Sequence, residues 1–527
     1  MLNVNGSVLR RTAFMLMVGL SAASASAEAP TLRPERSITA AGVRALQQVE
    51  PDLQNFVNQM ERLPGQDAFI PVRINPDPAT GFIWIDLGVG FMPRGQAGYD
   101  EGLGEKLRDI NEELSSYVEG EITYLSIRSR IGGKTLNDWF PPIPVLEREE
   151  KRRGEEKLKI SATPTVPGLV VINPGHGRYR HFATDTWEYQ RPSPYAGTTD
   201  VYEDQVTLQY ASALETYLRV NSRQFVTDVQ QTRDVLNAGI YSQSGYSWAA
   251  MASRYYVERL FPEERLTIWG RFPNGTSPGR VNLRHYDEDL ATRARYANYI
   301  GAETMISLHT DAAADTARGT SIVAKADDPQ SVQLAENILC YMKELIGAKE
   351  EYADYTIRPG VRPGENYAEV RDATMPTALI EIGFHSNVED SAALRNSSFR
   401  AAAVKGIEKG YRTFKKGETD CRPLTIISAP PVAGPHSTKI PYTVEYSGVP
   451  SYPLYLRTSV VSCPPNYSCS QLSTQYVSEG PTPGILAATA KCIVGRPVPG
   501  SVIVVDRYLE DGDGVKSAKV RTSITCS

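Results

Sequence analysis

The chain has 527 residues, of which 41% are hydrophobic and 22% are charged. At roughly 150 residues per domain this length predicts about three domains, and the aromatic content of 9% excludes a disordered or fibrous chain. The net charge of −5 lacks the basic excess of a dedicated nucleic-acid-binding protein. Five of the six cysteines follow residue 420. We therefore expect disulfides mainly near the C-terminus, which favours an oxidising compartment.

The N-terminus has the three-part layout of a secretory signal. Arg10 and Arg11 precede an apolar stretch over residues 13–20, and small residues end at Ala27. The apolar stretch is too short to span a bilayer, so we predict a signal peptide over residues 1–27 and a periplasmic or secreted mature protein. No later stretch approaches 18 consecutive apolar residues, which predicts no transmembrane segment after cleavage. Twin-arginine export and an uncleaved N-terminal anchor remain alternatives.

Composition shifts divide the rest of the chain. In residues 147–159, eleven of thirteen side chains are charged, directly after a Pro-rich run over residues 140–144. This combination is typical of a solvated linker. The expected segments are an α+β module of unknown role over residues 30–146, a charged linker over 147–167, a central domain over 168–415, a second linker over 416–431, and a β-rich module over 432–527.

Both flanking modules show recognisable elements. In the first, strands are expected at residues 83–89 and 123–127, and apolar residues recur at helical spacing between 103 and 117. In the last, runs over 502–509 and 515–524 predict a hairpin in an all-β, sandwich-like fold with disulfides. The positions of the cysteines leave the pairing open.

The central segment alternates strands and helices, which predicts an α/β domain with a mainly parallel sheet flanked by helices. The expected strands over 168–173, 304–308 and 377–380 are followed by His176, His309 and Glu381 respectively. Ligands of such sheets bind at the carboxyl ends of the strands, so these side chains can converge. Imidazole and carboxylate groups are common zinc ligands, and their joint placement predicts a metal site.

Four blocks of the central segment resemble the motifs of a known family. They are Val171-Ile172-Asn173-Pro174-Gly175-His176-Gly177, Tyr202-Glu203-Asp204-Gln205-Val206-Thr207-Leu208, Ser307-Leu308-His309-Thr310-Asp311-Ala312, and Leu379-Ile380-Glu381-Ile382-Gly383-Phe384-His385-Ser386-Asn387. In order and content they resemble the zinc-dependent N-acetylmuramoyl-L-alanine amidases of the type 3 family, over about residues 168–415.

The resemblance implies one Zn²⁺ per catalytic domain, held by His176, Glu203 and His309, with Glu381 as the catalytic carboxylate. It implies cleavage of the amide between N-acetylmuramic acid and L-alanine of the peptidoglycan stem peptide, in cell-wall remodelling or daughter-cell separation. Peptidoglycan would be the partner, with a protein activator as a further one. Spacing alone does not choose Glu203 among the nearby acids, which are Glu188, Asp200 and Asp204.

The chain departs from the family pattern at two residues and by one insertion. Asp311 stands where the family usually has Asn, and His385 stands where it often has an apolar residue; both are candidates for substrate contact, as is Arg371. His385 and Arg371 have structural roles as alternatives. An aromatic-rich insertion covers about residues 235–289, and we expect it to be a lid, an occluding element or a packed helical subdomain.

Two other functions remain open at this point. A zinc peptidase acting on peptides would use nearly the same metal chemistry. A non-catalytic wall-binding or regulatory protein could also use this scaffold, although such a protein has no need for Glu381.

Overall fold

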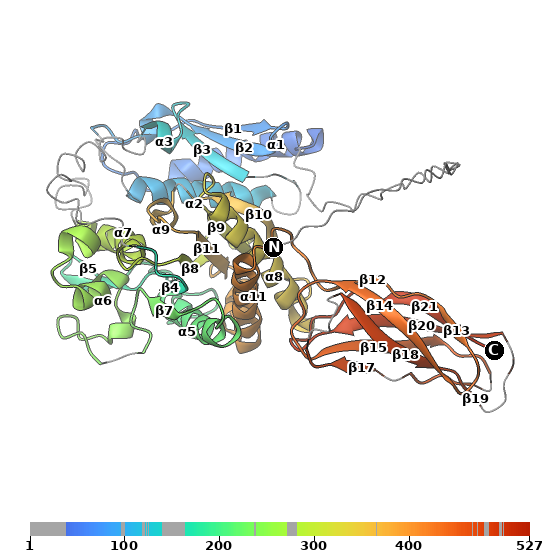
Figure 1. Cartoon of the computed structure of the whole chain (residues 1–527). Helices are drawn as coiled ribbons and strands as arrows, with labels where there is room; N and C mark the ends of the chain where they lie inside the picture. The colour runs from blue at the N-terminus through green and yellow to red at the C-terminus, as the bar shows by residue number, and fades with distance from the viewer. Residues whose placement is uncertain are drawn as a thin grey trace, which may run out of the picture. The chain divides into compact units, whose positions relative to one another are not determined.

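The computed structural model describes most of the chain from residue 38 onward (Figure 1). The described residues are 38–95, 101–118, 122, 124, 126–139, 164–236, 239–270, 282–364, 366–465, 467–471, 473–478, 484–494, 498 and 500–527. The predicted signal peptide, most of the charged linker and parts of the insertion therefore lie outside the described residues. Within the described part, no helix is both long and apolar enough to cross a membrane.

The N-terminal module has the predicted α+β composition. Its sheet has the order β1-β2-β3, with β1 (Val72–Asp77) antiparallel and β3 (Ser126–Ile131) parallel to the central β2 (Phe82–Leu87). Two long helices supply apolar side chains to its core, α1 (Ala40–Gln59) and α2 (Glu101–Val118). Short helical turns lie at η1 (Val89–Phe91) and α3 (Leu136–Trp139).

The central domain is built on a six-stranded sheet with the order β10-β9-β11-β8-β4-β7. The strands are β4 (Leu169–Pro174), β7 (Asp228–Gln231), β8 (Thr304–Asp311), β9 (Thr320–Ala324), β10 (Ile357–Pro363) and β11 (Thr377–Phe384). The four strands from β11 to β7 are parallel, and only the β9–β11 pair is antiparallel. The prediction of a mainly parallel sheet is confirmed.

Side-chain alternation places helices on both faces of this sheet. Val170 and Ile172 of β4 join one apolar core, and Leu169 and Val171 join another, because successive residues of a strand point to opposite faces. The first core is completed by α5 (Glu203–Asn221), α8 (Pro329–Gly347), α10 (Val388–Arg395) and α11 (Ser397–Lys415). The second core is completed chiefly by α7 (Arg284–Tyr299). The sheet edge that carries the predicted site residues is thus fixed between two packed layers.

The insertion packs as a small subdomain where the structure describes it. Its elements are η2 (Trp248–Ala250), α6 (Ser253–Leu260) and η3 (Arg265–Trp269). Tyr241 and Tyr255 contact Trp187, which lies outside the insertion on the hairpin of β5 (Arg178–His181) and β6 (Thr186–Tyr189). These contacts favour the structural alternative for its aromatic residues.

The C-terminal module is a β-sandwich of two sheets, with the orders β12-β14-β18 and β13-β21-β20-β15-β17. Its strands are β12 (Thr425–Ser428), β13 (Val432–Gly434), β14 (Lys439–Ser447), β15 (Leu454–Ser462), β16 (Tyr467–Ser468), β17 (Thr474–Tyr476), β18 (Ile485–Lys491), β19 (Ile493–Val494), β20 (Ser501–Glu510) and β21 (Val520–Cys526). Apolar side chains from both sheets share one core. The predicted hairpin corresponds to β20 and β21, which pair antiparallel.

The three disulfides are Cys340–Cys421, Cys463–Cys469 and Cys492–Cys526. The last two lie within the C-terminal module, as expected. The first differs from the expectation, since it ties α8 of the central domain to the second linker. Cys340 lies away from the motif blocks along the chain, but α8 and residue 421 approach each other in the folded domain.

Candidate metal and catalytic site

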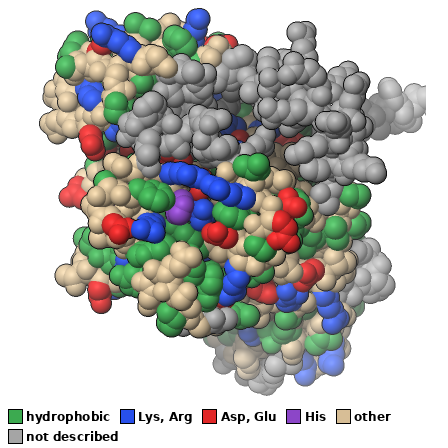
Figure 2. Space-filling view, turned by 90° about the vertical axis from the view of Figure 1, so that its left-hand side faces the viewer, with side chains coloured by type: hydrophobic (Ala, Val, Ile, Leu, Met, Phe, Trp, Pro, Cys, Tyr) green, Lys and Arg blue, Asp and Glu red, His purple; other side chains and the backbone are tan. Residues whose placement is uncertain are grey.

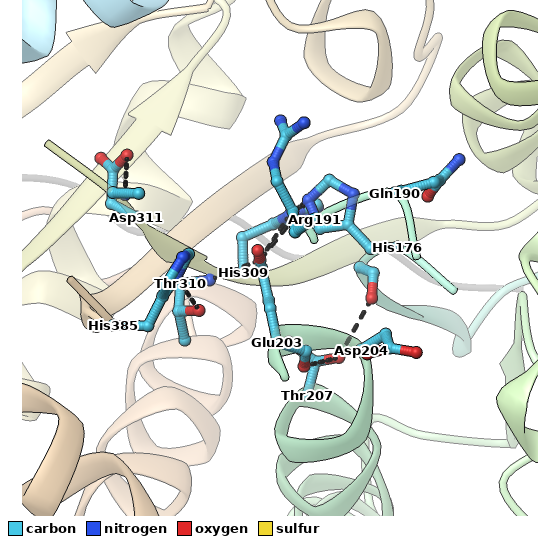
Figure 3. Close-up of polar contacts among 12 residues, drawn as sticks. His176, Gln190, Arg191, Glu203, Asp204, Thr207, His309, Thr310, Asp311 and His385 are labelled. Carbon is cyan, nitrogen blue, oxygen red and sulfur yellow. Dashed lines mark hydrogen bonds and ion pairs between the residues drawn. The ribbon is translucent and has the colours of Figure 1, made fainter. Parts of the chain in front are cut away.

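Three predicted side chains come together at the carboxyl edge of the central sheet (Figure 3). His176 follows β4, Glu203 begins α5, and His309 lies near the end of β8. The His309 Nδ1 atom lies 3.1 Å from His176 Nε2 and 3.4 Å from Glu203 Oε1. The remaining pair, His176 Nε2 and Glu203 Oε1, is 3.5 Å apart. The three side chains thus present one triangle of ligand atoms.

The Pro-Gly-His-Gly segment after β4 is shaped to bring His176 to this triangle. His176 has a φ of 64°, a left-handed conformation that a non-glycine residue rarely adopts outside functional sites. A Cβ atom on Gly175 would lie 2.3 Å from the His309 ring, and one on Gly177 would lie 2.5 Å from the Ala252 backbone. Gly175 is therefore needed for the close approach of His309 to this segment, and Gly177 for its packing against the Ala252 backbone.

The triangle fits a zinc ion. Zinc is held at about 2.0–2.1 Å by imidazole nitrogen and carboxylate oxygen, so the ligand atoms of a tetrahedral site lie about 3.3 Å apart. The three observed separations bracket that value, and all three side chains are buried. Three protein ligands leave one tetrahedral position for water or substrate, as in catalytic zinc sites.

A fourth residue, Glu369, orients His309. The Glu369 Oε1 atom lies 3.1 Å from His309 Nε2 and 2.5 Å from Nη1 of Arg293. This contact places the ring proton on Nε2 and leaves the lone pair of Nδ1 directed at the other two ligands. Sequence reasoning missed Glu369, which lies in the four-residue helix α9 (Ala368–Arg371). The only signal was its nearness in sequence to Arg371.

Glu381 lies beside the triangle, as predicted from the strand ends. It is paired in register with His309 across β11 and β8, so the two side chains point to the same face of the sheet. Burial and the neighbouring Asp311 carboxylate raise the pKa of Glu381 to about 8. Its Oε2 atom has no hydrogen-bond partner among the described residues. A buried carboxyl group of this kind can accept and donate a proton near neutral pH.

Comparison with known proteins assigns the central domain. Residues 170–412 match the family model described as N-acetylmuramoyl-L-alanine amidase, Amidase_3. These residues form a type 3 amidase domain. The assignment agrees with the resemblance of the four motif blocks and confirms the predicted enzyme class.

Solved amidase structures also align with this part of the chain. The catalytic domain of CwlV from Bacillus (Paenibacillus) polymyxa var. colistinus is 19% identical, with a TM-score of 0.30 over 47% of this chain and 99% of that one. AmiC2 of Nostoc punctiforme is 18% identical, with a TM-score of 0.30 over 48% and 99%. CwlD of Clostridioides difficile, solved in complex with the GerS lipoprotein, is 15% identical, with a TM-score of 0.32 over 48% and 100%. The family assignment rests on the match of residues 170–412 alone.

One curated protein also matches, with a different activity. The histidinol-phosphate aminotransferase of Bifidobacterium adolescentis is 24% identical over 234 residues, which are 44% of this chain and 54% of that protein. The chain spans about half the length of the curated protein it matches. An identity of 24% does not establish that the two proteins share an activity.

The other predicted site residues of the amidase domain have different surroundings. The Asp311 Oδ2 atom lies 3.6 Å from Nη2 of Arg362. His385 is buried, contacts Thr310 Oγ1 at 3.0 Å and stacks on Tyr195, which favours its structural alternative. Arg371 pairs with Asp372 at 3.0 Å, which also favours the structural alternative. These roles in substrate contact stay predictions.

The acidic residues near Glu203 lie in different positions relative to the two histidines. Asp204 follows Glu203 in the first turn of α5 but is not among the residues that converge. Glu188 accepts hydrogen bonds from Thr184 and Thr186 on the β5–β6 hairpin. Of the four acidic candidates, Glu203 is the one whose carboxylate reaches both histidines.

Replacing Glu369 by glutamine is expected to lower zinc affinity by about 10–100-fold, because the neutral amide holds the His309 ring less firmly. Zinc titration against a competing chelator measures this, with Glu258→Gln as the control, since Glu258 pairs with Arg254 on α6. Equal zinc affinities for the Glu369 variant and the wild type would exclude this orienting role.

Zinc binding is expected to depend on pH. Burial opposes the charged imidazole, yet hydrogen bonds with Glu203 and Glu369 raise the pKa of His309 to about 9 in the metal-free protein. A zinc ion must then displace a proton at neutral pH, so its affinity rises by about tenfold per pH unit and levels off above that pKa. Calorimetry in buffers of different ionisation enthalpy should detect release of at least about one proton per ion. No proton release near neutral pH would contradict the assignment of His309 Nδ1 as a ligand.

Proposed function

We propose that this chain is an exported, zinc-dependent peptidoglycan hydrolase that cleaves the amide between N-acetylmuramic acid and the L-alanine of the stem peptide. The observation that carries the proposal is the convergence of His176, Glu203 and His309 beside Glu381. It occurs within residues that match the amidase family. The donor set and its spacing support zinc as the metal.

In this proposal, His176, Glu203 and His309 hold the ion. A bound zinc ion would supply a Lewis acid that activates water and polarises the amide carbonyl. Glu381 accepts the proton of the attacking water and passes it to the leaving alanine amine. Its raised pKa suits both roles, because the carboxylate must bind a proton and then release it.

Export to the cell envelope is part of the proposal. The signal-like N-terminus supports it, and so do the three disulfides, which persist in oxidising compartments. The substrate would then be met outside the cytoplasm, in cell-wall remodelling or daughter-cell separation. CwlD has been solved in complex with a lipoprotein, and we include a protein activator among the proposed partners on that basis.

Metal dependence is tested on purified sacculi. The mature protein should release soluble peptide, lose this activity on treatment with a chelator, and regain it on addition of about one equivalent of zinc. Unchanged release after verified removal of the metal would contradict a zinc mechanism. Binding to sacculi without any release would favour the wall-binding alternative.

A further inference from the structure

Three arginines near the proposed site are not used in the chemistry above. Arg191 follows the β5–β6 hairpin, and Arg358 and Arg362 lie on β10. Figure 3 shows Arg191 beside His176 and His309, with its guanidinium group turned away from them. Arg362 contacts Asp311, which precedes the turn after β8. Guanidinium groups in such positions favour binding of carboxylates, often through two parallel hydrogen bonds.

Acidic side chains of α2, in the N-terminal module, contact all three arginines. Glu105 Oε1 lies 3.6 Å from Arg191 Nη1 and also accepts a hydrogen bond from the Tyr286 hydroxyl. Glu112 lies 3.3 Å from Arg358 Nη1 and forms an ion pair with Arg362. Two glutamates seven residues apart fall on the same face of a helix, two turns from each other. One face of α2 therefore carries two carboxylates to the three guanidinium groups.

The ion pair of Glu112 with Arg358 is strongly desolvated. Glu112 is 1% exposed and Arg358 is 6% exposed. Desolvation offsets most of the attraction within a buried ion pair, so such a pair contributes little net stability compared with apolar packing. A carboxylate of a ligand can replace the Glu112 carboxylate in this contact. The guanidinium groups then have a negatively charged partner both before and after the ligand binds. This favours a binding role for the arginines over a purely stabilising one.

We propose that Arg191, Arg358 and Arg362 form a subsite for the carboxylates of the peptide part of the substrate, and that Glu105 and Glu112 occupy this subsite until a substrate displaces them. The inference rests on the proposed function and names the substrate class of the same site. A rise of 1.5 Å per residue places Glu105 and Glu112 about 10 Å apart along α2. An extended peptide spans that distance in about three residues. The ligand is therefore an acidic peptide with two carboxylates about three residues apart.

The test is a binding measurement on the full mature chain without metal. The probe is a synthetic pentapeptide with glutamate at its second position and a free C-terminal carboxylate, compared with its neutral counterpart carrying glutamine and a C-terminal amide. Glu105→Gln/Glu112→Gln is expected to bind the acidic peptide about tenfold more tightly than the wild type, because the competing carboxylates are gone. Glu50→Gln is the matched control, since Glu50 pairs with Arg73 within the N-terminal module.

The arginines are tested in the same way. Adding Arg191→Gln or Arg362→Gln to the double variant should abolish the gain for the acidic peptide and leave binding of the neutral peptide unchanged. Equal affinity of the wild type and the double variant, or equal affinity for the two peptides, would overturn the proposal. If the double variant does not fold, Glu105→Gln alone serves, because Glu105 is the more exposed of the two glutamates.

Binding and hydrolysis separate the two proposals. A variant that binds the acidic peptide more tightly while no protein releases peptide from sacculi would sink the proposed function and leave the subsite standing. Release of peptide with no difference between the acidic and neutral probes would leave the function and remove the subsite.

Discussion

Replacing Glu381 by glutamine is expected to reduce peptide release from sacculi by about 10²–10⁴-fold, the usual contribution of a general acid–base group. Glutamine matches glutamate in size and keeps the packing of β11, but it cannot accept the proton of the attacking water. The zinc content of the variant should equal that of the wild type, because Glu381 is not among the three converging side chains proposed to hold the ion. Steady-state release rates and metal analysis of the same samples measure both effects.

The control for this variant is Glu389→Gln, which changes an exposed glutamate paired with Arg318 near the start of α10. It should retain full activity. If Glu381→Gln keeps more than about a tenth of the wild-type rate with zinc bound, another group moves the proton and the assignment of Glu381 is wrong.

Replacing His309 by alanine is expected to remove both the metal and the activity. Structural zinc sites with four ligands bind with about 10–16 kcal/mol, so one ligand contributes roughly 3 kcal/mol and its loss weakens binding by at least about a hundredfold. Zinc titration should show this fall in affinity, and peptide release should drop to background at equimolar zinc. Restoring part of the activity with excess zinc is compatible with the account.

The matched control is His181→Ala on β5, where the imidazole contacts Thr184 and is not one of the three converging side chains. This variant should bind zinc like the wild type. Wild-type zinc affinity in His309→Ala would show that the ion, if one binds, is held elsewhere.

The part of the site that follows strand ends could be predicted from sequence. His176, His309 and Glu381 each come after a short apolar run, and the carboxyl ends of parallel strands share one edge of the sheet. Glu203 required the resemblance to the family, because several acids lie within a few residues and spacing does not rank them. In the structure, Glu203 at the start of α5 is the acid that approaches His176 and His309.

Other features depend on contacts that local patterns do not encode. Glu369 lies on a single helical turn with no periodicity, and its role follows only from its distance to His309. The antiparallel direction of β9 against β11 depends on the packing of the sheet. The pattern of apolar residues in the sequence does not indicate it. The contacts of α2 with β10 join residues about 250 positions apart. Helical spacing predicted α2 itself but could not show which surface its acidic face meets.

The face shown in Figure 2 carries basic and acidic side chains interspersed with apolar ones. This distribution agrees with the balanced composition of the chain. Specific recognition would then come from local groups such as the three arginines of the proposed subsite.

The identity of the bond that is cleaved distinguishes an amidase from a peptidase. A muropeptide of defined structure should be incubated with the zinc-loaded protein and the products analysed by mass spectrometry. We expect an intact stem peptide with a new amine on its L-alanine, together with a peptide-free sugar that retains its lactyl group. Fragments produced only by cleavage within the peptide would show a zinc peptidase and contradict the account.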